Sequence, residues 1–71
     1  MPRKIILNQY LRDARLARGL SVADVASRVG VTAPCVYFWE IGRTRLRADN
    51  LNALCRVLKL PVRVTREIAA G

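Results

Sequence analysis

Gly30 lies between two short segments whose apolar residues recur at helical spacing, and this arrangement constrains the fold more than any other feature. Before the glycine, small and apolar residues occupy positions i, i+3, i+4 and i+7: Val22, Val25, Ala26 and Val29. The small side chain of Ala26 lets a second helix cross closely, and Gly30 can adopt the positive φ angle of a sharp turn. Apolar Val31 and Val36 can then hold the next segment against the first. The sequence therefore predicts two short helices joined by a tight turn.

Apolar stripes at helical spacing also precede and follow this pair. We expect helices over about residues 8–18, 22–29, 33–41 and 49–59, with the tail over 62–70 as a candidate fifth. The residues that mark helix ends are Asn8 and Thr32 as N-caps, Ser21 with Asp24 as a shortened capping box, Pro34 in a first turn, and Gly19, Gly42 and Pro61 as terminators. The predicted fold is all-α: one domain over residues 1–71, built as a compact bundle of four to five short helices.

The two ends of the chain fit more than one structure. Residues 4–7 suit either a short strand or a lead into the first helix. In the tail, Val62, Val64 and Ile68 partly suit an alternating strand, whereas the last two alone suit one helical turn with Thr65 as its cap. We expect a helix for the tail, with a short strand pair formed by both termini as the alternative.

The charge of the chain is strongly positive, with thirteen Lys and Arg against five Asp and Glu, a net charge of +8 and a pI near 11.1. Eleven of the thirteen basic residues are Arg, the side chain suited to bidentate contacts with phosphates and bases. This balance predicts a polyanionic partner.

The composition also excludes several classes of protein. The chain has no His, and Cys35 and Cys55 are far apart without a CxxC motif, so neither a His-based triad nor a metal site is expected. We interpret both cysteines as reduced, buried core residues of a cytosolic protein. No apolar run reaches the length of a membrane span, and no signal peptide is evident. We therefore expect no enzyme activity, no cofactor, no membrane association and no small-molecule ligand.

Five elements of the sequence, correctly spaced, resemble a known family. They are Gly19-Leu20-Ser21-Val22-Ala23-Asp24-Val25-Ala26, Gly30-Val31-Thr32, Val36, Trp39-Glu40-Ile41-Gly42, and Leu51-x-x-Leu54-Cys55-x-x-x-Leu58. In these residues the chain resembles the Cro/CI-type (XRE-like) helix-turn-helix family over roughly residues 7–62. The resemblance implies a lambda-repressor-like all-α bundle that binds double-stranded DNA, usually as a two-fold dimer on a palindromic operator.

The resemblance also implies roles for individual residues. The base-facing positions, on the third or recognition helix, are Ala33, Pro34, Tyr37 and Phe38. The phosphate-contacting positions are Val22, through the backbone amides that open the second helix, Thr32, and the loop arginines Arg43, Arg45 and Arg47. Arg15 and Glu40 match the buried ion pair that links the first and third helices in this family.

Two features depart from the family pattern. The second helix often begins with Gln and here begins with Val22, and the usually polar base-facing positions here carry Ala, Pro, Tyr and Phe. Such side chains cannot form bidentate hydrogen bonds with guanine or adenine. Base readout would have to use apolar contacts with thymine methyl groups, supplemented by groove shape, by DNA deformability and by arginines outside the helix.

Some of these residues also have structural interpretations. Trp39 is expected in the core, because it lies on the Val36 side of its helix. Tyr37 and Phe38 could form a dimer contact instead of a DNA-binding face, and the loop arginines could be merely solvated. We interpret Arg18 as surface charge, with a phosphate contact as the alternative.

The leading interpretation is a sequence-specific transcription regulator, most simply a repressor that binds a palindromic operator as a homodimer. We expect it to be cytoplasmic and nucleoid-associated, and bacterial or phage-encoded, with dimer surfaces on the fourth helix and the tail. No second domain is expected, so control would come from concentration, dimerisation or a partner protein. The main alternative is an antitoxin-type protein–protein module that masks a toxin and binds DNA secondarily. Sequence-neutral binding to DNA or RNA is a third interpretation.

Overall fold

The computed structural model describes residues 5–71, which fold into five α-helices without a strand. The helices are α1 (Leu7–Ala17), α2 (Val22–Val29), α3 (Ala33–Glu40), α4 (Ala48–Leu58) and α5 (Val62–Ala70). The all-α fold class is confirmed, and the tail is the expected helix. The alternative of a terminal strand pair is wrong over the described residues, because Ile5 and Ile6 lead directly into α1. Residue 4, the first of the candidate strand, lies outside the described part of the chain.

Both ends of α2 are capped, and its C-terminal cap forms the turn into α3. The Ser21 hydroxyl accepts a hydrogen bond from the Asp24 amide at 3.0 Å, and the Asp24 carboxylate accepts one from the Ser21 amide at 2.9 Å, which completes a capping box. Gly30 has a φ of 91°, a conformation that costs glycine nothing. The amides of Gly30 and Val31 both donate to the Ala26 carbonyl, at 2.8 and 3.0 Å. This turn directs α3 back onto α2.

Three expected helix caps differ in the structure. Asn8 lies inside α1, whose N-cap is Ile6, because apolar contacts of the first turn with the core start the helix earlier. Thr32 is the N-cap of α3 by backbone conformation, but its side chain makes no capping hydrogen bond. Thr65 is not a cap: it lies within α5, fully buried, and its hydroxyl donates to the Pro61 carbonyl at 2.8 Å.

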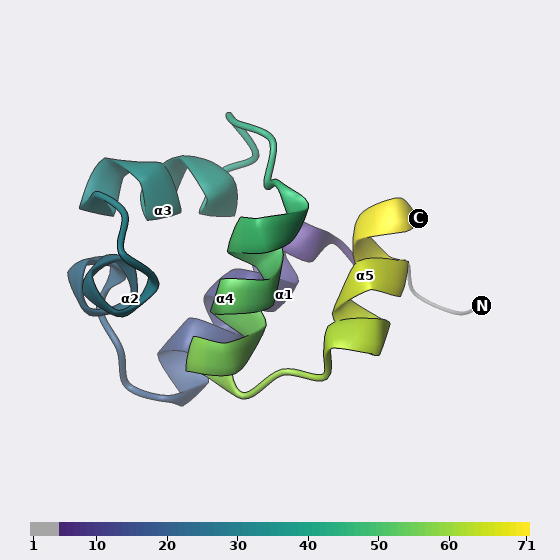
Figure 1. Ribbon diagram of the computed structural model, residues 1–71, viewed down its shortest axis with the longest axis horizontal. Coiled ribbons are helices and arrows are strands. Elements are labelled where there is room, and N and C mark those ends of the chain that lie inside the picture. Colours follow the sequence, from purple (N-terminus) through teal and green to yellow (C-terminus); the bar gives the residue numbers. More distant parts are fainter. Residues whose placement is uncertain (1–4) are drawn as a thin grey trace.

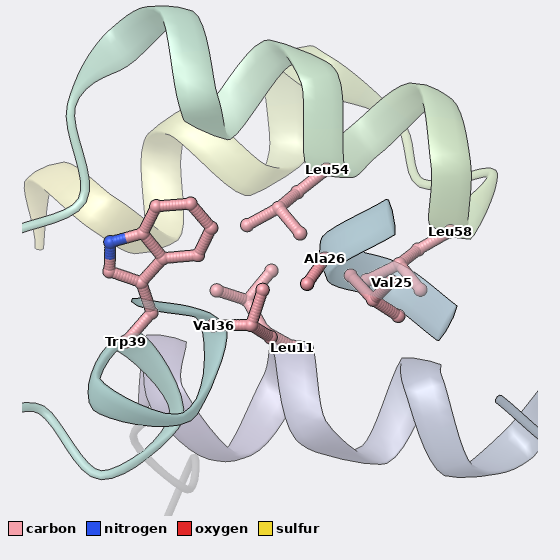
Figure 2. Packing of buried hydrophobic residues seen from close by; sticks show 7 residues of the cluster. All are labelled: Leu11, Val25, Ala26, Val36, Trp39, Leu54 and Leu58. Atoms are coloured by element: carbon pink, nitrogen blue, oxygen red, sulfur yellow. The ribbon is translucent and has the colours of Figure 1, made fainter. Parts of the chain in front are cut away.

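The core is formed by side chains from four helices that meet at the crossing of α2 and α3. Figure 2 shows the seven residues of this cluster, Leu11, Val25, Ala26, Val36, Trp39, Leu54 and Leu58. The indole of Trp39 points from α3 toward Leu54 of α4, and Trp39 is only 4% exposed, so its predicted core position is confirmed. The methyl group of Ala26 occupies the space in which the helices approach each other.

Both cysteines are free thiols, but only one belongs to the core. Cys55 is buried within α4, as expected. Cys35 packs against the core cluster but is only partly buried, so the expectation of a fully buried residue is wrong. The reason is its place on α3, where it lines a surface depression toward the loop that follows the helix. Within residues 5–71, no group of three or more His, Cys, Asp or Glu side chains is arranged to hold a metal ion.

Polar contacts join α1 to both α4 and α5. The chain leaves α4 through Lys59, which adopts a left-handed conformation with a φ of 56°. Arg18 is more than surface charge, because its Nε donates a 2.7 Å hydrogen bond to the Leu58 carbonyl at the end of α4. The Tyr10 hydroxyl lies 3.4 Å from the Thr65 hydroxyl, which joins α1 to α5.

Figure 1 shows how these contacts arrange the helices. α3 lies along one edge of the molecule above α2, and the loop over residues 41–47 continues along the same edge before α4 begins. α5 lies at the opposite end of the longest dimension, which measures 37 Å. One side of α3 is therefore left without a covering element.

Candidate nucleic-acid interface

α3 has one buried side and one exposed side. Val36 and Trp39 point into the core. On the opposite side Tyr37 is 51% exposed and Ile41, the residue directly after the helix, is 49% exposed. Residues three and four apart share a helix face, so these two belong to one surface. We call this surface the outer face of α3; its members are Ala33, Pro34, Tyr37, Phe38 and Ile41.

The aromatic rings of the outer face are held in place by neighbouring groups. The Tyr37 and Phe38 ring centroids are 6.0 Å apart, with their planes tilted by 53°. The guanidinium carbon of Arg43 lies 5.8 Å from the centroid of the Phe38 ring, within cation–π range. The Arg43 amide also donates to the Phe38 carbonyl at 2.9 Å. These contacts restrict the half-buried Phe38 ring and place a positive charge directly beside it.

The loop over residues 41–47 carries three exposed arginines beside the outer face. Between loop and helix lies a shallow depression of about 380 Å³. Its lining residues are Thr32, Pro34, Cys35, Phe38, Trp39, Thr44, Arg45, Arg47 and Asn50. The fold therefore brings together Thr32, two loop arginines and two of the candidate base-facing residues. Val22 is placed apart from this group: it is half-buried on α2, against the core.

The carboxylate of α3 is turned away from this surface. Arg15 Nε donates to Glu40 Oε2 at 2.7 Å and Arg15 Nη2 donates to Glu40 Oε1 at 2.9 Å, so the ion pair implied by the family resemblance is present. Arg15 Nη1 also donates to the Leu20 carbonyl at 2.9 Å. The hydrogen bond to Glu40 raises the pKa of Arg15 further above its ordinary value. With Glu40 neutralised on the inner side, no carboxylate of α3 offsets the loop arginines.

A second carboxylate lies at the start of α2. The Ser21 amide, which donates to the Asp24 carboxylate, lowers the pKa of Asp24 below its ordinary value, and the neighbouring Ser21 side chain lowers it further. Asp24 is therefore negative at neutral pH. Its charge is next to the amides near Val22 to which the family resemblance assigns a phosphate contact, and it opposes an anion at that position.

Comparison with known proteins places this arrangement in a family. The model of a family described as a helix-turn-helix domain matches residues 7–68 of the chain. The chain belongs to this helix-turn-helix family. The resemblance noted in the sequence is thus confirmed, and the domain is that of a DNA-binding transcription regulator and not of an enzyme.

Solved structures show the same helix-turn-helix fold. Two crystal structures of the clp gene regulator ClgR from Corynebacterium glutamicum are similar at 26% sequence identity, with TM-scores of 0.80 and 0.78. They cover 92% of this chain and 69% and 84% of the ClgR chains. The solution structure of the DNA-binding domain of the P22 C2 repressor has 22% identity and a TM-score of 0.83, over 92% of this chain and 86% of that one. Comparison with curated proteins gave no match.

The structure adds residues to the surface of this helix-turn-helix domain that sequence reasoning missed. Ile41 extends the outer face by one turn beyond Tyr37, and its spacing from Pro34 and Tyr37 is a signal that the sequence contained. Thr44 and Asn50 line the depression but had no such signal, because only folding brings the start of α4 beside α3. Among residues 5–71, no helix has the length and apolar character needed to cross a bilayer.

Proposed function

We propose that this protein recognises a specific duplex DNA sequence by placing the outer face of α3 in the major groove, and that it acts most simply as a repressor. One observation carries the proposal: the uncovered side of α3 lies beside three exposed arginines, while its own carboxylate pairs inward with Arg15. A projecting helix with positive charge on its flank matches the shape and charge of the major groove.

The residues of the surface divide into two roles in this proposal. Base edges are met by Ala33, Pro34, Tyr37 and Phe38, with Ile41 at the far end. Phosphates are met by Thr32, Arg43, Arg45 and Arg47, with a weaker contribution from the amides near Val22. Because phosphate contacts carry no sequence information, the arginines supply affinity and the outer face supplies preference.

We further propose that the protein binds a palindromic operator as a homodimer. One α3 helix can contact only a few base pairs, and two α3 helices related by a two-fold axis contact twice as many. The exposed valines of α5, Val62 at 39% and Val64 at 44%, support a dimer contact on the side of the molecule away from α3. Half-sites about one helical turn apart are the expected consequence.

Selection of bound duplexes from a random pool tests the proposal. The expected result is an enriched inverted repeat whose half-site spacing reports the dimer. If each subunit neutralises about three or four phosphates, log K against log salt has a slope of roughly −5 to −7. A slope near zero contradicts the phosphate contacts, and a pool without enrichment contradicts sequence-specific recognition.

The second candidate is an antitoxin-type module whose outer face binds a partner protein and whose DNA binding is secondary. The exposure of Tyr37 and Ile41, both apolar in character, favours it, since such patches also serve protein contacts. The two candidates differ in the selection experiment: the module gives no enriched repeat. If the protein is such a module, replacing Tyr37 leaves its DNA affinity unchanged. If it is a sequence-specific regulator, the same replacement removes its sequence preference.

A further inference from the structure

The outer face of α3 is almost without hydrogen-bonding side chains. It presents a methyl group, a pyrrolidine ring, two aromatic rings and a branched aliphatic chain, from Ala33, Pro34, Phe38, Tyr37 and Ile41. Its one polar atom is the hydroxyl of Tyr37. Of the remaining polar side chains of the helix, Glu40 is bound to Arg15. The polar groups Thr32, Thr44 and Asn50 line the depression at one side of the face.

In the major groove, the group that such a face can recognise is a methyl group. Thymine projects its C5-methyl there, and apolar side chains discriminate by burying it. Cytosine methylated at C5 projects the same group from the same ring position. On the basis of the proposed function, we infer that α3 reads C5-methyl groups of pyrimidines, in thymine and in 5-methylcytosine alike.

The geometry of Phe38 and its neighbours supports this inference. The Tyr37 ring, with its centroid 6.0 Å away, and the Arg43 guanidinium, 5.8 Å away, restrict the Phe38 ring before any ligand arrives. A fixed aromatic surface buries a methyl group with little loss of side-chain entropy. The positive charge of Arg43, Arg45 and Arg47 beside the face selects a duplex as the occupant over an uncharged apolar partner.

Deoxyuridine differs from thymidine in lacking this methyl group, and it provides the direct test. Selected half-sites are expected to contain T·A pairs in the α3 footprint. Replacing one contacted thymine by uracil weakens binding about four-fold, the effect of losing one buried methylene-sized group. Replacing the same T·A pair by 5-methylcytosine·G gives binding about four-fold tighter than the unmethylated C·G duplex. Uracil outside the footprint is the control and leaves affinity unchanged.

Protein variants connect the effect to the outer face. The double variant Tyr37→Ala with Phe38→Ala reduces the uracil penalty to less than two-fold and keeps the salt slope, because the loop arginines remain. Leu16→Ala removes a side chain of similar exposure (54%) from α1 and retains the full penalty. Circular dichroism checks that both variants are folded. The measurements of the wild-type protein with uracil-containing duplexes test the inference even if a variant does not fold.

The outcomes separate this inference from the proposed function. If an inverted repeat is enriched but no thymine in the half-site shows a uracil penalty, methyl reading is overturned and the regulator remains. If the half-sites lack T·A pairs, the inference is overturned in the same way. If no duplex binds in a salt-dependent manner, both fail together.

Discussion

The guanidinium of Arg15 donates two hydrogen bonds to the carboxylate of Glu40, and this pair links α1 to α3 across 25 positions of the sequence. The two side chains are only 11% and 8% exposed. The pair joins α3 to α1, and it withdraws a negative charge from the outer face of α3. Stability and the electrostatics of the interface therefore depend on the same contact.

Removing one partner of this pair is expected to cost more than the pair itself contributes. Glu40→Gln removes the counter-ion of the buried Arg15 guanidinium, which keeps its hydrogen bond to the Leu20 carbonyl, and lowers the free energy of unfolding by about 3 kcal/mol. Urea denaturation at pH 7 measures the change. The control is Glu67→Gln, which breaks the exposed Arg63–Glu67 pair at 3.6 Å and leaves the urea midpoint unchanged. Equal effects at the two sites would contradict the structural role assigned to Arg15.

Acid weakens the start of α2 through Asp24. Because its folded-state pKa is depressed, Asp24 contributes stability above the ordinary aspartate value of about 3.9, and this contribution is lost as the pH falls through the folded value. The stability difference between the wild type and Asp24→Asn is therefore greater at pH 6 than at pH 2.5. Thermal unfolding across this range measures it. A difference that stays constant, or grows toward low pH, would show that the carboxylate is not stabilised by Ser21.

Lys59, the left-handed residue at the end of α4, is a position at which a substitution can stabilise the fold. Lys59→Gly relieves the unfavourable positive φ and raises the free energy of unfolding by about 0.5–1 kcal/mol, after the greater flexibility of unfolded glycine is subtracted. Arg56→Gly is the matched control, since it places glycine at an exposed position inside α4 and costs about 1 kcal/mol. In urea denaturation, the changes in the free energy of unfolding of these two variants are expected to have opposite signs. Destabilisation by Lys59→Gly would contradict the left-handed conformation.

The loop arginines are expected to act on all DNA sequences equally. Arg45→Ala removes one phosphate contact per subunit, weakens binding to specific and random duplexes by the same factor, and makes the salt slope shallower by about 1 for each phosphate no longer neutralised. Binding isotherms at several salt concentrations provide the slope. Arg12→Ala, at an exposed position of α1 outside both the loop and the outer face of α3, changes neither quantity. Weaker binding to the specific site alone would instead assign a base contact to Arg45.

Much of the fold could be predicted because its signals are local. The spacing of apolar residues located the first four helices and left the tail open between a helix, which was favoured, and a strand. The Ser21–Asp24 capping box and Gly30 marked the start and end of α2. Side-chain caps were predicted less well. Asn8 and Thr65 have the chemistry of caps, but burial of their helices against the core placed both inside helical turns. Packing outweighs the free energy of one capping bond.

The composition of the candidate interface was likewise readable along the chain, as a run of apolar residues on α3 followed by alternating arginines. That no other element covers the outer face of α3 could not be read there. It depends on Trp39 and Val36 packing against residues from distant helices, and on Arg15 holding Glu40 inward. Periodicity states which residues share a face, since it follows from backbone geometry. The direction of that face is a property of long-range contacts, and only the folded chain contains them.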